Sequence, residues 1–406
     1  MDRFKTLTTI IMAGGRGERL FPLTRDKAKP AITFGGIYRI IDFTLSNCFN
    51  SGIRRIYVLS QYGSFSLDQH LRVAWNIMHP DLGEYIYSVP PQQITVNRWY
   101  RGTADSIYQN LNLLDQERPR QVLILSGDHV YKMDYAAMLD FHLSREADLT
   151  VAAVMVPRSE SRSFGILSVD GDSRVVDFLE KPAAPPGLPG NPDFCLGSMG
   201  VYLFRAGTLV QEVIRDAKQK DSHHDFGRDI IPSMMKRLRV FAYNFHHPAT
   251  GAPHYWRDIG RLDAYFAAHQ DLLGEHPVFD LFDPVWPVRG HLSLSPPARF
   301  VSGKKGVEVS DSFIASGCVI QEAMVRRSVL SPQVAVGPGA RVEEAVLWDG
   351  VEVGAGARVR RAIIEDKVKI PPKFSLGFDR EADARRFPVT EEGLVIVPNN
   401  VVLEED

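Results

Sequence analysis

Apolar residues in the first two thirds of the chain follow two patterns that alternate. Short, nearly continuous apolar runs predict buried strands, and the clearest of them cover residues 8–12, 55–60, 121–125, 149–156, 200–204 and 240–244. Between several runs, apolar residues recur at three- and four-residue intervals, as in 107–114 and 135–143, which predicts helices. This alternation predicts a mostly parallel, Rossmann-like sheet with helices on both faces over residues 1–284.

The pattern changes after residue 284. Residues 285–299 contain Pro287, Pro296 and Pro297 and predict an irregular linker. From 300 to 406 short β-branched units replace the helical spacing, and V-G-P-G-A-R-V at 336–342 returns as V-G-A-G-A-R-V at 353–359. An aliphatic residue at every sixth position predicts the coils of a parallel β-helix, with a sandwich of valine-rich strands as the alternative.

Composition limits the class of protein. With 406 residues, 44% apolar and 24% charged, the chain predicts a globular protein of two domains. A net charge of −2 provides no basic field, so we expect no nucleic-acid partner. We find no apolar targeting segment and no run long enough to span a membrane, and the three separated cysteines fit neither a disulfide framework nor a metal site. We therefore expect a cytoplasmic protein without a membrane partner.

A glycine-rich loop follows the first apolar run. It reads G-G-R-G-E-R-L at 14–20, and Lys29 lies shortly after it. Gly14 and Gly15 let backbone N–H groups approach anionic oxygens, while Arg19 and Lys29 add positive charge. The spacing matches neither a Walker loop nor the dinucleotide fingerprint. We interpret the loop as a polyphosphate site, with a plain turn between strand and helix as the alternative.

A second candidate site follows the apolar run at 121–125. Gly127 and Asp128 come directly after Ser126, which places a carboxylate at the mouth of the predicted sheet. A hard oxygen ligand on a strand end suits Mg²⁺. The alternative is that Asp128 caps a helix that begins near Asp134.

These motifs resemble the signature of the sugar-1-phosphate nucleotidyltransferases. The glycine loop followed by A-K-P at 28–30 is typical of the whole family. The segments F-G-G at 34–36, R-I-I-D-F at 39–43 and L-S-N at 45–47 are similar to the bacterial glucose-1-phosphate adenylyltransferases. The similarity covers nearly the whole chain. It implies that residues 300–406 form a left-handed β-helix used in oligomerisation and regulation, and we expect a homotetramer.

The resemblance also implies a reaction. ATP and glucose 1-phosphate would give ADP-glucose and diphosphate for glycogen synthesis, with Mg²⁺ held by Asp128 and by Asp258 of the W-R-D-I-G motif at 256–260. The sugar phosphate would attack the α-phosphorus in line, while Arg19 and Lys29 stabilise the triphosphate. Two alternatives remain, a non-catalytic regulatory subunit of the same family and a sister enzyme that uses another nucleoside triphosphate.

The nucleotide positions implied by the resemblance lie in two segments. In W-Y-R-G-T-A-D-S at 99–106, Tyr100 would contact substrate and Gly102 would let the purine approach the backbone. Gln61 occupies a position that the family places near the nucleotide. The alternative for residues 99–106 is a helix start capped by Thr103, and both can hold together.

The sugar positions come from three further family elements. Gly165, Glu180, Lys181 and Ser198 match them, with Glu180 accepting from sugar hydroxyls and Lys181 pairing with the sugar phosphate. A solvated charge pair is the alternative for Glu180 and Lys181. Residues 225–229 also match the family near the sugar, and the sequence assigns them no role.

Regulation by phosphorylated metabolites is a further implication of the resemblance. Basic candidates for an effector site are Arg25, Lys27, Arg39, Arg385 and Arg386, the last two with a solvated surface turn as the alternative. Non-basic residues stand where activated members of the enteric type carry basic ones, namely Asp26, Asp366, Asn400 and Glu404. Carboxylates repel an anionic ligand. We therefore expect fructose 1,6-bisphosphate not to be a strong activator, while another phosphorylated metabolite remains possible.

Overall fold

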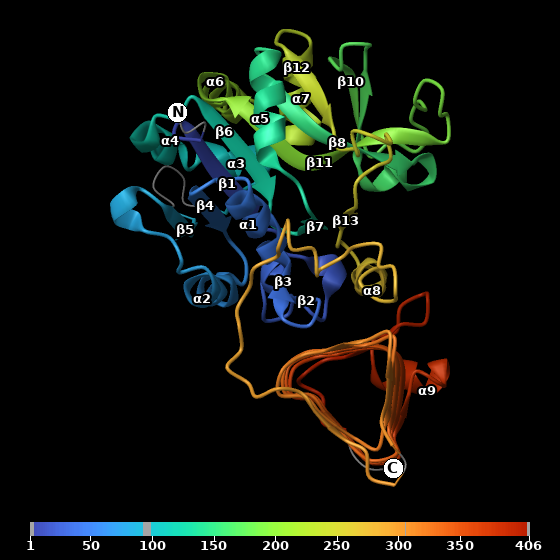
Figure 1. Cartoon of the computed structure of the whole chain (residues 1–406). Helices are drawn as coiled ribbons and strands as arrows, with labels where there is room; N and C mark the ends of the chain where they lie inside the picture. The colour runs from blue at the N-terminus through green and yellow to red at the C-terminus, as the bar shows by residue number, and fades with distance from the viewer. Residues whose placement is uncertain (1–3, 92–98, 305, 404–406) are drawn as a thin grey trace.

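The computed structural model describes residues 4–91, 99–304 and 306–403 of the chain. It consists of an α/β domain stacked on a triangular β-helix (Figure 1). Both architectures predicted from the sequence are confirmed. Within the described ranges, no helix combines the length and the apolar character that a membrane crossing needs. Glu404 and the first three residues lie outside the described residues.

A nine-stranded sheet forms the centre of the α/β domain as described. Its main path runs β10-β9-β11-β6-β1-β4-β5, and β8 joins β11 to β12. The strands are β1 (Leu7–Ala13), β4 (Arg55–Ser60), β5 (Tyr85–Val89), β6 (Gln121–Ser126), β8 (Leu149–Pro157), β9 (Gly165–Val169), β10 (Val175–Glu180), β11 (Phe194–Arg205) and β12 (Val240–Asn244). The neighbours β6, β1, β4 and β5 are parallel, whereas β11 runs antiparallel to β6. The parallel strands therefore present their carboxyl ends at one edge.

Helices cover both faces of the sheet. On one face α1 (Ile40–Asn50), α2 (Ser64–Ala74) and α5 (Tyr135–Ser144) bury side chains such as Leu45, Leu67 and Met138. On the other face lie α3 (Thr103–Tyr108), α4 (Leu111–Glu117), α6 (Ala206–Ala217) and α7 (Ile231–Met235). Burial on both faces is why the central strands are almost continuously apolar.

The single helix predicted over residues 107–114 is wrong, because the structure divides this region between α3 and α4. The division falls at Asn110, whose side-chain amide donates to the Ser106 carbonyl at 2.8 Å and to the Tyr100 hydroxyl at 3.0 Å. An asparagine that bonds locally competes with helical hydrogen bonds. At the break, Asn110 links the start of α4 to Tyr100.

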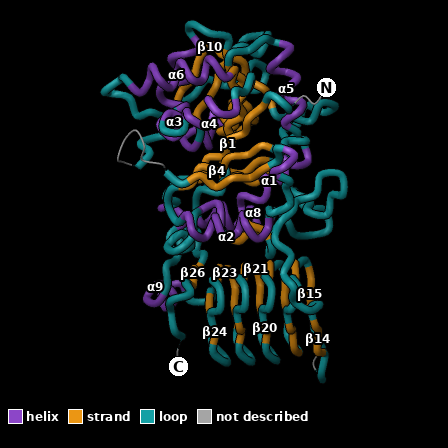
Figure 2. The backbone as a smooth tube through the Cα atoms, turned by 90° about the vertical axis from the view of Figure 1, so that its left-hand side faces the viewer, coloured by secondary structure: helices purple, strands orange, loops and turns teal. Residues whose placement is uncertain are grey.

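The second part is a parallel β-helix whose coils lie side by side in Figure 2. One face consists of β14 (Arg299–Val301), β17 (Val319–Gln321), β20 (Ala335–Val336), β22 (Glu352–Val353) and β24 (Lys369–Ile370). The other faces are formed by β15 (Glu308–Ser310), β16 (Phe313–Ile314), β18 (Met324–Arg326), β19 (Val329–Leu330), β21 (Arg341–Leu347), β23 (Arg358–Ile364), β25 (Ser375–Leu376) and β26 (Val395–Val397). Val325, Val342 and Val359 stack in register and are fully buried. Val353 and Val359, and likewise Ile364 and Ile370, lie six residues apart and are buried, so the six-residue spacing lines the core.

A segment without helix or strand connects α8 (Leu262–Gln270) to β14. It packs along α1, where the Trp286 indole donates to Asn47 Oδ1 at 2.8 Å and the Arg289 amide donates to Ser46 Oγ at 2.8 Å. Side chains from both parts also form one apolar cluster, in which Trp348 of the β-helix is fully buried and donates to the Tyr265 hydroxyl at 3.0 Å. The two parts therefore share a packed core.

Candidate active site

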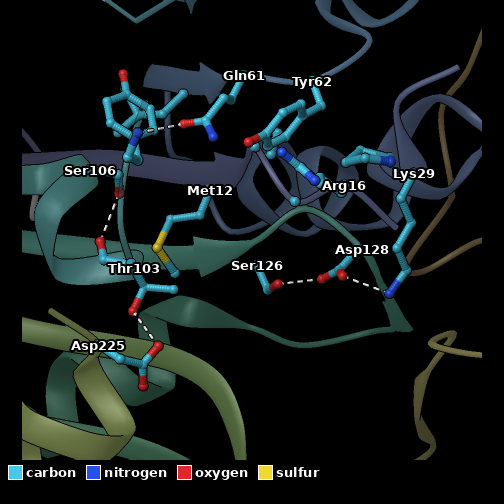
Figure 3. Close-up of a pocket in the computed structure, with 17 residues that line it drawn as sticks. Met12, Arg16, Lys29, Gln61, Tyr62, Thr103, Ser106, Ser126, Asp128 and Asp225 are labelled. Carbon is cyan, nitrogen blue, oxygen red and sulfur yellow. Dashed lines mark hydrogen bonds and ion pairs between the residues drawn. The ribbon is translucent and has the colours of Figure 1, made fainter. Parts of the chain in front are cut away.

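The carboxyl ends of three parallel strands converge on one cavity. Ala13 of β1 is level with Ser60 of β4, and Met12 is level with Ser126 of β6. The loops that follow these strands line a cavity of about 440 Å³ (Figure 3). A cavity of this size is typical of small-molecule sites. The predicted residues that line it are Gly14, Gly15, Lys29, Gln61, Tyr100, Gly102 and Asp128.

Hydrogen bonds hold the far wall of this cavity in place. The Gln61 side-chain carbonyl accepts from the Tyr100 amide at 2.9 Å, which ties the loop after β4 to the segment before α3. Thr103 is the first residue of α3 and Gly102 occupies the cap position, so the alternative of Thr103 as the helix cap is wrong. Its hydroxyl instead donates to Asp225 Oδ2 at 3.0 Å.

An acidic centre lies where the cavity meets a small two-stranded sheet. The strands β7 (His129–Tyr131) and β13 (Trp256–Asp258) pair antiparallel, with Asp258 opposite His129. Asp128 immediately precedes β7, so the pairing places both carboxylates side by side. Lys29 Nζ lies 2.6 Å from Asp128 Oδ2 and 3.4 Å from Asp258 Oδ1. The structure therefore brings Lys29, Asp128 and Asp258 together from three distant segments.

Lys29 and the two carboxylates of this centre stabilise one another's charged forms. Burial by itself lowers the pKa of Lys29, but the carboxylates of Asp128 and Asp258 more than offset it, so this pKa is raised. Burial likewise opposes ionisation of Asp128, yet Lys29, His129 and the Ser126 hydroxyl hold the pKa of that carboxyl far below its usual range. Both side chains are therefore charged at neutral pH. The alternative that Asp128 caps a helix is wrong, because Asp134 caps α5.

The same centre fits a divalent cation. Asp128, His129 and Asp258 offer ligand atoms that all lie within 4.8 Å of one another. Carboxylate oxygens on paired strands match the donor preference of hard divalent ions, and a ring nitrogen suits several transition metals. The buried Nδ1 atom of His129 has no hydrogen-bond partner among the described residues. Sequence reasoning missed His129, although it directly follows Asp128.

A smaller cavity of about 220 Å³ adjoins the first one. It is lined by all four residues predicted to bind the sugar, Gly165, Glu180, Lys181 and Ser198. A Cβ atom at residue 165 would lie 2.4 Å from Phe178 Cζ, so only glycine fits there. Lys181 Nζ lies 3.3 Å from Glu180 Oε1. Asp258 also lines this cavity, whereas Asp128 lines the first, so the acidic centre lies at their junction.

Arg19 lines a different cavity from Gly14 and Gly15 of the glycine loop. Its exposed side chain lines a third cavity, of about 610 Å³, together with Asp258 and Arg261. Lys29 and Arg19 therefore approach the acidic centre from different cavities. The sequence predicted both cations but not this separation.

The predicted effector residues lie in two places. Three are at the domain junction, where Lys27 pairs with Asp366, Arg39 Nη2 lies 3.8 Å from Asp349 Oδ2, and Arg25 pairs with Asp26 at 2.8 Å. The other two, Arg385 and Arg386, belong to α9 (Arg380–Arg386), where the Arg386 guanidinium lies 4.9 Å from the centre of the Phe374 ring. Asp26 and Asn400 are exposed.

Comparisons with known proteins match both parts of the chain. The family model described as nucleotidyl transferase matches residues 8–275, and the one described as GlmU-like, C-terminal hexapeptide, matches residues 296–397. The second match assigns the β-helix to the left-handed class of hexapeptide repeats.

Several curated relatives are similar over nearly their whole length. Glucose-1-phosphate adenylyltransferase 2 of Alkalilimnicola ehrlichii is 47% identical over 98% of this chain and 94% of its own. Glucose-1-phosphate adenylyltransferase 2 of Vibrio vulnificus is 48% identical over 97% and 98%. The glucose-1-phosphate adenylyltransferase of Rhodopirellula baltica is 47% identical over 96% and 89%. With these identities and the site geometry, the chain belongs to the glucose-1-phosphate adenylyltransferase family of nucleotidyl transferases.

Proposed function

We propose that the chain transfers the adenylyl group of ATP to glucose 1-phosphate, forming ADP-glucose and diphosphate for glycogen synthesis. The observation that carries this proposal is the position of the acidic centre. Asp128 faces the cavity of about 440 Å³ and Asp258 faces the adjoining cavity of about 220 Å³, so two substrates held in these cavities meet beside both carboxylates. The cavity of about 440 Å³ takes ATP, and the adjoining cavity of about 220 Å³ takes the glucosyl group.

The reaction requires positioning more than proton transfer. The phosphate of glucose 1-phosphate is largely dianionic near neutral pH, so its oxygen attacks the α-phosphorus of ATP without a general base. Glu180 accepts from sugar hydroxyls and Lys181 faces the sugar phosphate. Backbone amides of Gly14 and Gly15 approach the triphosphate, and Lys29 leaves its carboxylate partners to pair with phosphate oxygens. Diphosphate departs on the side that Arg19 reaches.

Mg²⁺ is the proposed cofactor, with Asp128 and Asp258 as its protein ligands. When bound, it neutralises phosphate charge and orients the two substrates. His129 lies near enough to be a third donor. Asp128 and Asp258 are paired with Lys29 in the structure, so ion binding and release of Lys29 are linked.

Assembly, location and regulation complete the proposal. The enzyme is a cytoplasmic homotetramer that uses its β-helix between subunits. Effector binding would require the junction cations Arg25, Lys27 and Arg39, and two of these face carboxylates of the β-helix. We therefore predict that fructose 1,6-bisphosphate activates the enzyme less than about tenfold at micromolar levels, because an anion must displace an acidic partner. Activation of several tens of fold would contradict this.

The decisive experiment is a nucleotide panel with the purified chain. Diphosphate release is measured with glucose 1-phosphate, Mg²⁺ and each of ATP, UTP, dTTP and GTP, and the sugar nucleotide is identified by mass. ADP-glucose from ATP as the main product supports the proposal. A different preferred nucleotide supports the sister-enzyme alternative, and no release with any nucleotide supports the regulatory subunit. The charged residues Arg19, Lys29, Asp128 and Asp258 speak against the regulatory alternative.

A further inference from the structure

The segment of residues 222–227 contributes to both substrate cavities, and the mechanism above gives it no role. Asp225 lines both cavities, and Gly227 lines the sugar cavity. A Cβ atom at residue 227 would lie 2.9 Å from Glu180 Oε2. The segment therefore touches the sugar side directly.

The same segment also contacts the start of α3, which lies beside the nucleotide cavity. The His224 carbonyl accepts from the Ala104 amide at 2.8 Å and from the Asp105 amide at 3.4 Å, in the first turn of α3. A Cβ atom at residue 102 would lie 2.3 Å from the same carbonyl, so Gly102 can lie here only because it has no side chain. Gly102 lines the nucleotide cavity. A shift of His224 therefore moves a wall of this cavity.

Thr103 adds a second link between the segment and α3. Its hydroxyl donates to Asp225 Oδ2 at 3.0 Å (Figure 3). It also accepts from the Phe226 amide at 3.0 Å. Asp225 Oδ1 meanwhile accepts from the Gly227 amide at 2.9 Å. One aspartate thus ties the nucleotide helix to the residue beside Glu180.

A buried pair anchors this segment to α6. His224 Nδ1 lies 2.7 Å from Asp216 Oδ2, and the Ser222 hydroxyl donates to Asp216 Oδ1 at 2.6 Å. His224 is 1% exposed and Asp216 8%. The backbone of His224 has φ of 56°, a left-handed conformation that residues other than glycine adopt at a cost. The side-chain bond to Asp216 offsets this cost.

The pair is not what stability alone would favour. His224 Nε2 is buried and has no partner among the described residues, and an unsatisfied polar atom in the interior destabilises a fold. Residues that break a local rule in this way occur at functional sites. We propose that the buried pair of His224 and Asp216 positions residues 222–227 as a brace between the two cavities and so sets the affinity for both substrates. The identity of those substrates rests on the proposed function.

The test compares His224→Leu with His224→Asn, which keeps a polar atom at the Nδ1 position and tolerates the left-handed backbone. His142→Leu is the matched control, because His142 is also 1% exposed and hydrogen-bonded, at 2.8 Å to Thr150 Oγ1, but lies on the other face of the sheet. Amide hydrogen exchange at residues 103–106 and KM for ATP and for glucose 1-phosphate are measured for each protein.

We expect His224→Leu to exchange these amides about tenfold faster and to raise both KM values about fivefold, because opening the brace loosens both walls. His224→Asn restores both readouts, and His142→Leu changes neither. Unchanged exchange in His224→Leu, or unchanged KM for either substrate, overturns the proposal. If His224→Leu does not fold, Asp216→Asn replaces it, with the same outcomes.

Exchange is measured on the free protein and needs no substrate. A wild-type chain without adenylyl transfer would therefore refute the proposed function and leave the exchange result to decide whether the brace exists.

Discussion

Lys27 and Lys29 lie two positions apart in the sequence and both pair with aspartates, but the surroundings of the two lysines differ. Lys29 contacts both Asp128 and Asp258 and borders an open cavity of about 440 Å³. Lys27 pairs with Asp366 of the β-helix, and its Nζ atom lies 4.5 Å from the centre of the Trp348 ring. The first pair borders the cavity in which we propose that phosphates bind, whereas the second packs against an indole and joins two domains. The two lysines make similar ion pairs, but only Lys29 lines the cavity of about 440 Å³.

The pKa values of acidic side chains are shifted in opposite directions in the two regions. Neighbouring cations hold the pKa of Asp128 low despite its burial. At the junction burial dominates and raises the pKa of Asp349 and of Glu365, even though Arg39 and Lys27 respectively oppose it. Ionisation thus stabilises the folded catalytic centre and slightly destabilises the junction.

The largest expected effect comes from breaking the catalytic pair. Asp128→Asn should fold normally but lower kcat at least about a hundredfold, because a neutral amide is a poor ligand for a divalent ion. Circular dichroism and steady-state diphosphate release check both parts. Turnover near that of wild type would refute the role assigned to Asp128.

A smaller loss of activity is expected when Arg19, which lines a different cavity from Lys29, is replaced. Arg19→Gln should lower kcat about thirtyfold, equivalent to about 2 kcal/mol of transition-state stabilisation, since its exposed guanidinium is partly screened by water. If Arg19 acts on the leaving diphosphate, KM for glucose 1-phosphate should stay within about twofold. A rise in that KM without a change in kcat would place Arg19 on the sugar instead.

The junction pair should affect stability and not turnover. Lys27→Met and Asp366→Asn should show a coupling free energy of unfolding of about 0.5–1 kcal/mol in a double-mutant cycle, because both side chains are about a fifth exposed. The kcat of each variant should stay within about twofold of wild type, as neither residue lines a substrate cavity. A large fall in kcat would mean that the two regions are coupled.

The smallest expected effect is a pH-dependent change in stability at the domain junction. The raised pKa of Asp349 means that, as pH rises above its ordinary value of 3.8, the unfolded chain loses this proton before the folded one does. Stability is therefore lost as pH rises through the folded pKa, and Asp349→Asn should show a small gain in unfolding free energy at neutral pH that disappears on acidification. Urea unfolding at several pH values measures this gain. An equal gain at all pH values would assign it to packing.

Local apolar patterns predicted the strands that are buried along most of their length. The continuous apolar runs of β1, β4 and β6 gave the correct strands, and the loops after them lie around one cavity. The prediction of residues 200–204 captured only the end of β11 (Phe194–Arg205), because the apolar run is interrupted by Gly197, Ser198 and Gly200. In the structure they belong to a strand with a register shift between Ser198 and Tyr202.

Contacts between distant segments could not be predicted from the sequence. Lys29, Asp128 and Asp258 were found through motifs, whereas His129 was missed. The cavity that Arg19 lines includes residues of β13, which pairs with the distant strand β7. The Lys27–Asp366 pair joins two domains, and the role of Asp225 depends on Thr103 in another element. These features arise from tertiary packing, which local patterns do not encode.

The most direct test of the catalytic centre is a crystal structure of the chain with Mn²⁺ and a non-hydrolysable ATP analogue. Anomalous scattering locates the ion without bias. We predict Mn²⁺ between the carboxylates of Asp128 and Asp258, with Lys29 Nζ moved from Asp128 to a phosphate oxygen. An ion bound elsewhere, or Lys29 still paired with Asp128 while the analogue occupies the cavity, would contradict this account.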